Sequence, residues 1–359
     1  MLLGLGCLFV SGCVSQMLTK AIVQAPNRRD VPWLLRPENA SVLAHNDQLY
    51  RHSWRLPVGP PDAELAVAVI EPGNYRLAHS IKTGERINGR APVWPQSDWQ
   101  LPADPLPGLD APKGTLLILH GYHDCKENMI HWALYLAQHG YRSVLVDLRG
   151  HGRSTGDWIG YGAFEVDDLR KVIDDLAARK LISGPIGVVG LSYGASVGLQ
   201  LAGQDERVGA AVAIEPFSNS RTAVVEFARG VVPQYVGGWT QADFDHAEDQ
   251  AARRGRFSWE ATDILGAVQR THAPILYAVA AGDRWISPEN SKRLADQTHS
   301  PHALLTVNFD NPGGIEQHVL LSWILDPIAP AVARWLDGVL LHPGPDLPER
   351  MQTYLDPAQ

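Results

Sequence analysis

The sequence predicts an α/β fold with a mostly parallel, doubly wound sheet, and three observations lead to this class. From Gly114 onward, short apolar runs alternate with helical patterns, as expected for a parallel sheet covered by helices on both faces. With 359 residues, 45% of them hydrophobic, the chain can bury a sizeable core. One 60-residue gap between two apolar runs has only helical patterns, which indicates an inserted helical cap.

The charge balance bears on the class of partner. The chain has 31 Lys and Arg against 39 Asp and Glu, a net charge of −8, and no basic stripe. Binding to a phosphate backbone depends on clustered cations that release counterions. Nucleic acid is therefore not an expected partner, and no cofactor is expected.

The first twelve residues, 1–12, have the apolar texture and length of a secretory signal and are too short to span a bilayer. Val10-Ser11-Gly12-Cys13 resembles the bacterial lipobox, which implies acylation of Cys13 after cleavage. The first basic residue is Lys20, whereas such signals usually start with one. The alternative is an uncleaved apolar arm in which Cys13 is a small residue.

A lipid on Cys13 implies a protein anchored in a bacterial cell envelope. An Asp after the cysteine commonly retains such proteins at the inner membrane. This chain has Val14 at that position, so an outer-membrane location is also compatible with the sequence. Cys7 would leave with the signal, so that Cys125 would remain without an intrachain partner.

The N-terminal half begins with segments of weak periodicity. Residues 13–63 are expected to form a tether and an irregular segment, and 84–112, rich in Pro and Trp, a loop. Residues 64–70 and 75–81 surround turn residues and should be strands of an antiparallel edge.

The remaining elements follow in regular order. Strands are predicted at 115–120, 143–147, 186–190, 210–214, 275–280 and 304–309. A helix is expected over 163–180, and the last helix, 318–340, should bend or split at Pro327 and Pro330. The predicted domain spans 64–345 and contains the inserted helical cap at about 216–272, and a C-terminal tail follows at 346–359. Within the inserted cap, Thr240 and Ser258 could each be the N-cap residue of a helix.

Two stretches fit Gly-x-Ser-x-Gly, a pattern typical of nucleophilic serines. In GLSYG, Ser192 follows a predicted strand directly and precedes a small-residue helix, the context in which a sharp turn exposes the hydroxyl. In GRSTG, Ser154 lies in a loop with no helix after it. We therefore predict Ser192 as the nucleophile and Ser154 as a turn residue.

Five motifs in order resemble the α/β-hydrolase superfamily, in the branch with monoglyceride lipases, serine aminopeptidases and related esterases. The motifs are LHGY (119–122), DLRGHGRS (147–154), GLSYGA (190–195), AGDRWISP (281–288) and EQH (316–318). The resemblance implies that fold, a catalytic triad in the order Ser, acid, His, and a GHGxS loop with a structural role.

The resemblance assigns His318 as the general base, because it follows the last predicted strand and a Gly-rich loop. Asp283, in a Gly-Asp turn after a strand, occupies the family's usual position for the acid. Glu215, at the end of the preceding strand, is the competing acid. The backbone N–H groups of Tyr122 and Tyr193 would form the oxyanion hole.

Competing functions stay open at this point. A metallohydrolase could use His120, His123 and Asp124, although no further ligand stands at a recognisable spacing. A lipid-anchored binding protein could keep the fold without catalysis. Among hydrolases, the sequence favours a carboxylesterase for small or medium acyl esters over an aminopeptidase or amidase, since the cap is rich in apolar side chains. These are Phe217, Phe227, Val231, Val232, Tyr235, Trp239 and Phe244.

Overall fold

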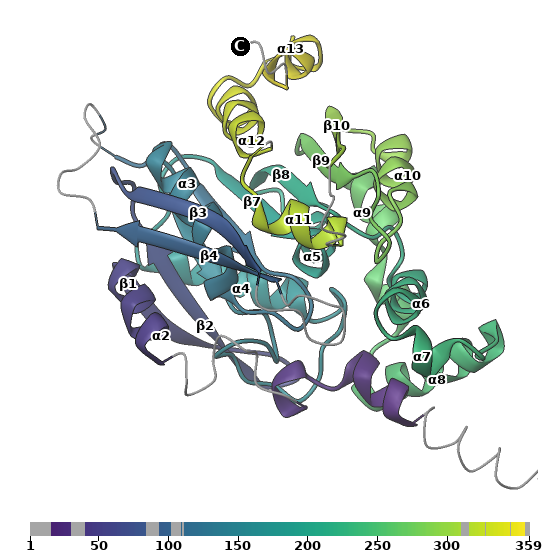
Figure 1. Cartoon of the computed structure of the whole chain (residues 1–359). Coiled ribbons are helices and arrows are strands. Elements are labelled where there is room, and N and C mark those ends of the chain that lie inside the picture. Colours follow the sequence, from purple (N-terminus) through teal and green to yellow (C-terminus); the bar gives the residue numbers. More distant parts are fainter. Residues whose placement is uncertain are drawn as a thin grey trace, which may run out of the picture.

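The computed structural model describes residues 16–29, 40–83, 93–101, 109, 111–309, 316–326, 328–344 and 346–355. Cys13 and the predicted signal lie outside these residues. The central feature is an eight-stranded sheet in the order β1-β2-β6-β5-β7-β8-β9-β10 (Figure 1). Within the described chain, no helix has the length and apolar character needed to cross a membrane.

The sheet is parallel from β6 to β10 and antiparallel at β1 and β2. Its strands are β1 (His52–Val58), β2 (Ala63–Ile70), β5 (Thr115–Leu119), β6 (Arg142–Val146), β7 (Ile186–Leu191), β8 (Val208–Ile214), β9 (Ile275–Ala280) and β10 (His302–Val307). Strands β5, β7 and β9 are buried at every residue, as expected for a sheet covered on both faces. The predicted α/β class with a mostly parallel, doubly wound sheet is confirmed.

Helices cover both faces of the sheet. The α-helices are α2 (Ala40–Asn46), α3 (Ile130–Gln138), α4 (Glu165–Ala178), α5 (Tyr193–Ala202), α6 (Ser220–Val231), α7 (Pro233–Val236), α8 (Gln241–Gly255), α9 (Ile264–Arg270), α10 (Glu289–Gln297), α11 (Gln317–Trp323), α12 (Ala329–Leu336) and α13 (Leu347–Tyr354). Short 3-10 turns occur at η1 (Pro26–Arg28), η4 (Asp47–Leu49), η5 (Lys126–Met129) and η6 (Trp259–Thr262), and a π turn at η7 (Asp337–Leu341).

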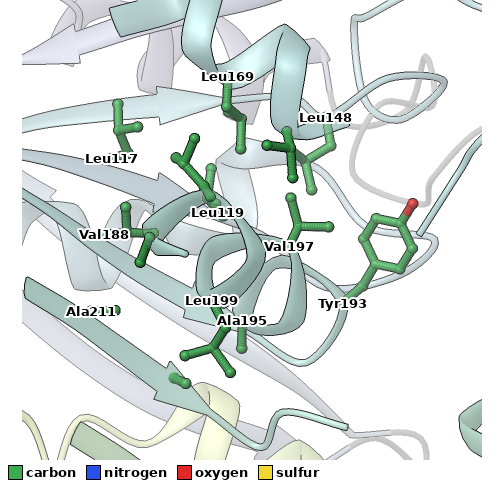
Figure 2. Packing of buried hydrophobic residues seen from close by; sticks show 14 of the residues in the cluster. Leu117, Leu119, Leu148, Leu169, Val188, Tyr193, Ala195, Val197, Leu199 and Ala211 are labelled. Atoms are coloured by element: carbon green, nitrogen blue, oxygen red, sulfur yellow. The ribbon is translucent and has the colours of Figure 1, made fainter. Parts of the chain in front are cut away.

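Each face has its own apolar core. Helices α4, α5, α9 and α10 share one buried cluster with alternate side chains of the central strands, and α3, α12 and η7 share the other. Figure 2 shows the first cluster, in which Val197 and Leu199 of α5 lie near Leu119 and Val188 of the sheet. The helix after β7 is therefore held firmly against the strand that precedes it.

The N-terminal part differs from the prediction in three places. The stretch 13–63, which is expected to be irregular, contains a helix at residues 16–23 and the strand β1. Strand β1 pairs with β2. The strand expected at 75–81 exists as β3 (Arg76–Thr83), but it does not pair with β2. It pairs with β4 (Val93–Gln100), which lies in the predicted loop 84–112, to form a separate two-stranded sheet.

The cap and the C-terminus also need correction. Thr240 caps α8 through a capping box as expected, whereas Ser258 precedes η6 without a side-chain cap hydrogen bond. Helix α9 packs on α5 within the main core, so the helices that overhang the sheet are α6 to α8 (Figure 1). The last helix splits into α11 and α12, as predicted. The expected tail 346–359 contains α13, whose Leu347 and Met351 are buried.

Candidate active site

Ser192 lies at the sharp turn between β7 and α5. Its backbone is in a strained region, with φ 49° and ψ −109°, which a residue other than glycine rarely adopts. The Ser192 N–H donates to the carbonyl of Ile214 at 2.7 Å, and this bond fixes the turn against β8. A strained strand-to-helix turn is the geometry that presents a nucleophilic hydroxyl.

The flanking glycines are required by close backbone contacts. A Cβ at Gly190 would lie 2.4 Å from the carbonyl oxygen of Gly194, and a Cβ at Gly194 would lie 2.5 Å from that of His120. Side chains at either position would therefore force α5 away from the sheet. Gly190 and Gly194 are therefore required because the neighbouring backbone leaves no room for a Cβ, in addition to any need for a flexible turn.

Ser154, the second match to the pattern, has a structural role. Its hydroxyl donates to the carbonyl of Asp147 at 2.6 Å and accepts from the N–H of Ala66 at 2.8 Å. The Asp147 carboxylate in turn accepts from the backbone N–H groups of Lys126 and Arg153. The GRSTG loop is thus folded around Asp147, and the Ser154 hydroxyl is buried in these contacts.

His318, at the start of α11, meets both candidate acids. Its Nδ1 lies 2.7 Å from Oδ2 of Asp283, which follows β9, and it is also in contact with Oε2 of Glu215, which follows β8. Asp283 Oδ1 accepts the backbone N–H groups of Trp285 and Ile286, at 2.8 and 3.0 Å. The structure brings together the predicted base and the preferred acid, together with the competing acid.

The charges of this cluster shift its pKa values in different directions. Burial raises the pKa of Glu215 to about 8. Burial acts to raise the pKa of Asp283 as well, but hydrogen bonds from His318 and its other donors lower it below the ordinary value. Burial would lower the pKa of His318, yet the two carboxyl groups raise it. Asp283 is therefore the carboxyl group most favoured to be ionised.

The predicted oxyanion donors belong to the two segments that meet at Ser192. Tyr193 is the first residue of α5, so its N–H has no acceptor within the helix. Tyr122 follows β5 and lines the same cavity as Ser192. The Tyr193 hydroxyl donates to Glu165 at 2.9 Å, and the Tyr122 hydroxyl donates to the carbonyl of Ala21 at 2.7 Å. Both hydroxyls are thus held in structural contacts, and the backbone groups remain the candidates for anion binding.

The alternative metal site at His120, His123 and Asp124 is not supported. Nδ1 of His120 faces the carbonyl of Gly121 at 2.8 Å, and its Nε2 accepts the Leu148 N–H at 3.0 Å. Both ring nitrogens are therefore engaged by the backbone.

In the part of the chain that the structure describes, one set of three metal-ligating side chains converges, namely Glu215, Asp283 and His318. The contact between His318 and Asp283 has the geometry of a hydrogen bond, so this cluster is explained as a hydrogen-bonded acid–base group.

A cavity of about 730 Å³ opens beside Ser192 and His318. Four of the seven apolar cap residues predicted to line it do so, namely Phe217, Phe227, Val231 and Val232. Trp239 and Phe244 instead pack on each other in the interior of the cap, and Tyr235 is 67% exposed. The cavity is therefore mainly apolar, with α6 as one of its walls.

The N-terminal helix forms a second wall that the sequence did not predict. Leu18, Ala21 and Ile22 line the cavity, and the side chain of Arg29 lies over the ring of Tyr122. Thr19 contacts the carbonyl of Ala247 in α8, which fixes this helix beside the cap (Figure 1). The only sequence signal was the apolar spacing of residues 18, 21 and 22, which is too short to distinguish a lining from a core.

The cap carboxylates, which an aminopeptidase could use to bind an amine, have structural partners. Glu226 accepts from Ser287 and Asn290, Asp243 belongs to the α8 capping box, and Glu248 pairs with Arg221. Asp245 and Asp249 also lie near the Arg221 guanidinium. None of these five carboxylates lines the cavity. Asp124 and Glu316 are the described carboxylates that do.

Comparison with solved structures supports the fold. A 2,6-dihydroxy-pseudo-oxynicotine hydrolase matches with a TM-score of 0.54 and 14% identity, over 86% of this chain and 76% of that chain. An esterase of Pyrococcus furiosus matches with a TM-score of 0.51 and 15% identity, over 82% of this chain and 95% of that chain. The α/β-hydrolase fold implied by the five sequence motifs is therefore confirmed.

A curated relative and a family model extend the comparison. The uncharacterized protein YqkD of Bacillus subtilis is 28% identical over 193 residues, which cover 53% of this chain and 62% of that protein. The model of the X-Pro dipeptidyl-peptidase (S15) family matches residues 23–304, most of the chain, including Ser192 and Asp283. The chain therefore belongs to the X-Pro dipeptidyl-peptidase (S15) family and has the α/β-hydrolase fold.

Proposed function

We propose that this protein is a carboxylesterase that cleaves small or medium acyl esters through an acyl-enzyme at Ser192. The observation that carries the proposal is the mainly apolar cavity beside Ser192 and His318, closed on one side by α6. An apolar wall of this kind stabilises an alkyl or aryl acyl group by removing its surface from water. It offers few polar groups to a peptide backbone.

Each residue has a role in this reaction. His318 takes the proton of the Ser192 hydroxyl while the oxygen attacks the ester carbonyl, and it later gives that proton to the leaving alcohol. The N–H groups of Tyr122 and Tyr193 stabilise the oxyanion, each worth about 10² to 10³ in rate. Asp283 orients the imidazole through Nδ1 and stabilises the imidazolium. Water then attacks the acyl-enzyme by the same route.

The substrate class is tested with two matched series. We expect p-nitrophenyl esters with acyl chains of two to about eight carbons to be cleaved, with an optimum set by the cavity, and aminoacyl or dipeptidyl p-nitroanilides to be cleaved much more slowly. A higher kcat/KM for the amides would contradict the esterase proposal. Fluorophosphonate labelling reports separately whether Ser192 is reactive, independently of the acyl group.

A second candidate is a peptidase or amidase, and Asp124 is the specific observation in its favour. Asp124 lines the cavity, where it could bind a substrate amine. Burial raises its pKa to about 7, so that its carboxyl group is fully ionised only above that pH. A peptidase that used Asp124 would cleave N-terminally free amides faster as pH rises through about 7, and Asp124→Asn would remove this rise.

We also propose that the protein is lipid-anchored through Cys13 in a bacterial cell envelope. The support is the Val10-Ser11-Gly12-Cys13 sequence after an apolar run. One acyl chain binds a membrane only weakly, so stable anchoring requires the several chains of a bacterial lipoprotein or a further membrane contact.

A further inference from the structure

Glu215 and Asp283 converge on one imidazole nitrogen, although a catalytic triad needs a single acid. The two carboxyl groups come from the ends of neighbouring parallel strands, β8 and β9, and their oxygens and His318 Nδ1 all lie within 4.8 Å of one another. Both side chains are buried. Two ionised carboxylates this close, with one imidazole between them, would repel each other strongly.

The hydrogen bonds divide the two acids into different roles. The proton on His318 Nδ1 has hydrogen-bond geometry toward Asp283 Oδ2, at 2.7 Å. Asp283 Oδ1 accepts two backbone N–H groups, so Asp283 has the surroundings of an anion. Glu215 Oε1 accepts one N–H, from Ala280 at 3.1 Å, while its buried Oε2 contacts His318 Nδ1 without hydrogen-bond geometry.

We propose that Glu215 is a positioning residue that remains protonated, and that its Oε2–H donates to the Asp283 carboxylate beside His318. A proton on Oε2 satisfies this buried atom, which otherwise makes no hydrogen bond of good geometry, and the Asp283 carboxylate belongs to the same cluster of atoms within 4.8 Å. A carboxylic acid kept neutral in an active site so that it can donate is a known use of burial.

The neutral state also suits the chemistry of the base. If both acids were ionised, two negative charges would hold the imidazole as a cation, which cannot accept the Ser192 proton. With Glu215 protonated, one negative charge faces Nδ1 and His318 can act as the base. The titratable groups that act on the pKa of His318, in the part of the chain described, are Glu215 and Asp283. The direction of the Glu215 shift, toward the protonated form, agrees with this.

The test compares Glu215→Gln, Glu215→Leu and Asp283→Asn, with Glu206→Gln as the control. Glu206 is exposed in the turn at the opposite end of β8. The readout is the rate constant for fluorophosphonate labelling of Ser192, which does not depend on the natural substrate. Gln keeps a donor in the place of the neutral acid, so its rate should stay within about tenfold of wild type. Leu should lower the rate about 10- to 100-fold, and Asp283→Asn about 10⁴-fold.

Two further readouts separate positioning from stability. In Glu215→Gln the acid limb of the pH–rate profile should move by less than about half a pH unit, and the low-field NMR signal of the His318 Nδ1 proton should persist. A limb displaced to lower pH, or a loss as deep as that of Asp283→Asn, would show that Glu215 is ionised and overturn the inference.

Since the inference rests on the proposed nucleophile, the wild-type protein is measured first. Absence of label at Ser192 in folded wild-type protein would contradict the proposed function, and the inference with it. Labelled wild type with an inactive Glu215→Gln variant that melts normally would overturn the inference alone.

Discussion

Ser154 Oγ lies 2.6 Å from the carbonyl oxygen of Asp147 and donates its proton to it. The same hydroxyl accepts the N–H of Ala66, so it connects β2 to the loop after β6. A hydroxyl occupied on both sides in this way is not available for nucleophilic attack. The structural relationship thus explains why one of two matching motifs has no place in the proposed chemistry.

Replacement of the two serines should give opposite outcomes. Ser192→Ala is expected to lower kcat by about 10⁴-fold or more, with little change in the melting temperature. Ser154→Ala should retain most of the turnover, but it leaves a buried N–H without an acceptor, at a cost of about 1 to 3 kcal/mol. Ester hydrolysis and thermal unfolding of both variants test this. Full turnover in the Ser192→Ala variant would exclude Ser192 as the nucleophile.

Much of the sheet could be predicted from the sequence because its central strands are buried on both faces. Such strands appear as continuous apolar runs, and β9 was placed at the residues where it occurs. Edge strands give no such signal. β1 is mostly exposed and contains Pro57, and β10 alternates in burial, so β1 was missed and β10 was placed two residues late.

The site could be predicted in part for a different reason. Ser192 was identifiable because a strand and a small-residue helix flank it. The sequence could not decide between Glu215 and Asp283, since both follow parallel strands and therefore reach the same edge of the sheet. Nor could it place residues 18, 21 and 22 in the cavity, because contact between the N-terminal helix and the cap depends on tertiary structure.

The glycine at 194 should be intolerant of a methyl group. Gly194→Ala places a Cβ 2.5 Å from the His120 carbonyl oxygen, so α5 must shift, and we expect a loss of about 1 to 3 kcal/mol together with most of the activity. Gly238→Ala is the control, because its Cβ has no atom within 4 Å. Chemical denaturation measures the difference. Equal stabilities of the two variants would refute the packing argument.

Phe227 should set the length of the acyl group. Its ring lies between those of Tyr122 and Trp285, with centroids 5.8 Å from each, at the wall of the cavity. Phe227→Ala should widen the cavity and move the optimum of kcat/KM toward longer p-nitrophenyl esters. Tyr235→Ala, which alters an exposed cap residue, should leave the optimum in place. An unchanged chain-length profile in Phe227→Ala would place the acyl group elsewhere.

The pH dependence follows from the protonation of His318. The base must be neutral, so kcat/KM is lost as pH falls through its pKa. Because the ionised Asp283 beside Nδ1 raises the pKa of His318, the loss should begin above the ordinary histidine value of about 6.5. Asp283→Asn removes one negative charge, so its residual activity should persist to lower pH. If the acid limb of the kcat/KM profile of Asp283→Asn lies at the same pH as in the wild type, a group other than His318 causes the loss.

The anchor at Cys13 would keep the cavity close to a membrane. Leu18, which lines the cavity, lies five positions after Cys13, and an extended chain of that length spans at most about 18 Å. Cys13→Ser should therefore move the exported protein from the membrane to the soluble fraction. Its rate on a water-soluble ester should stay the same, and its rate on an ester embedded in vesicles should fall. A membrane-bound Cys13→Ser protein would refute the lipid anchor, whereas an equal vesicle rate in a soluble variant would show that anchoring does not bring this cavity to its substrate.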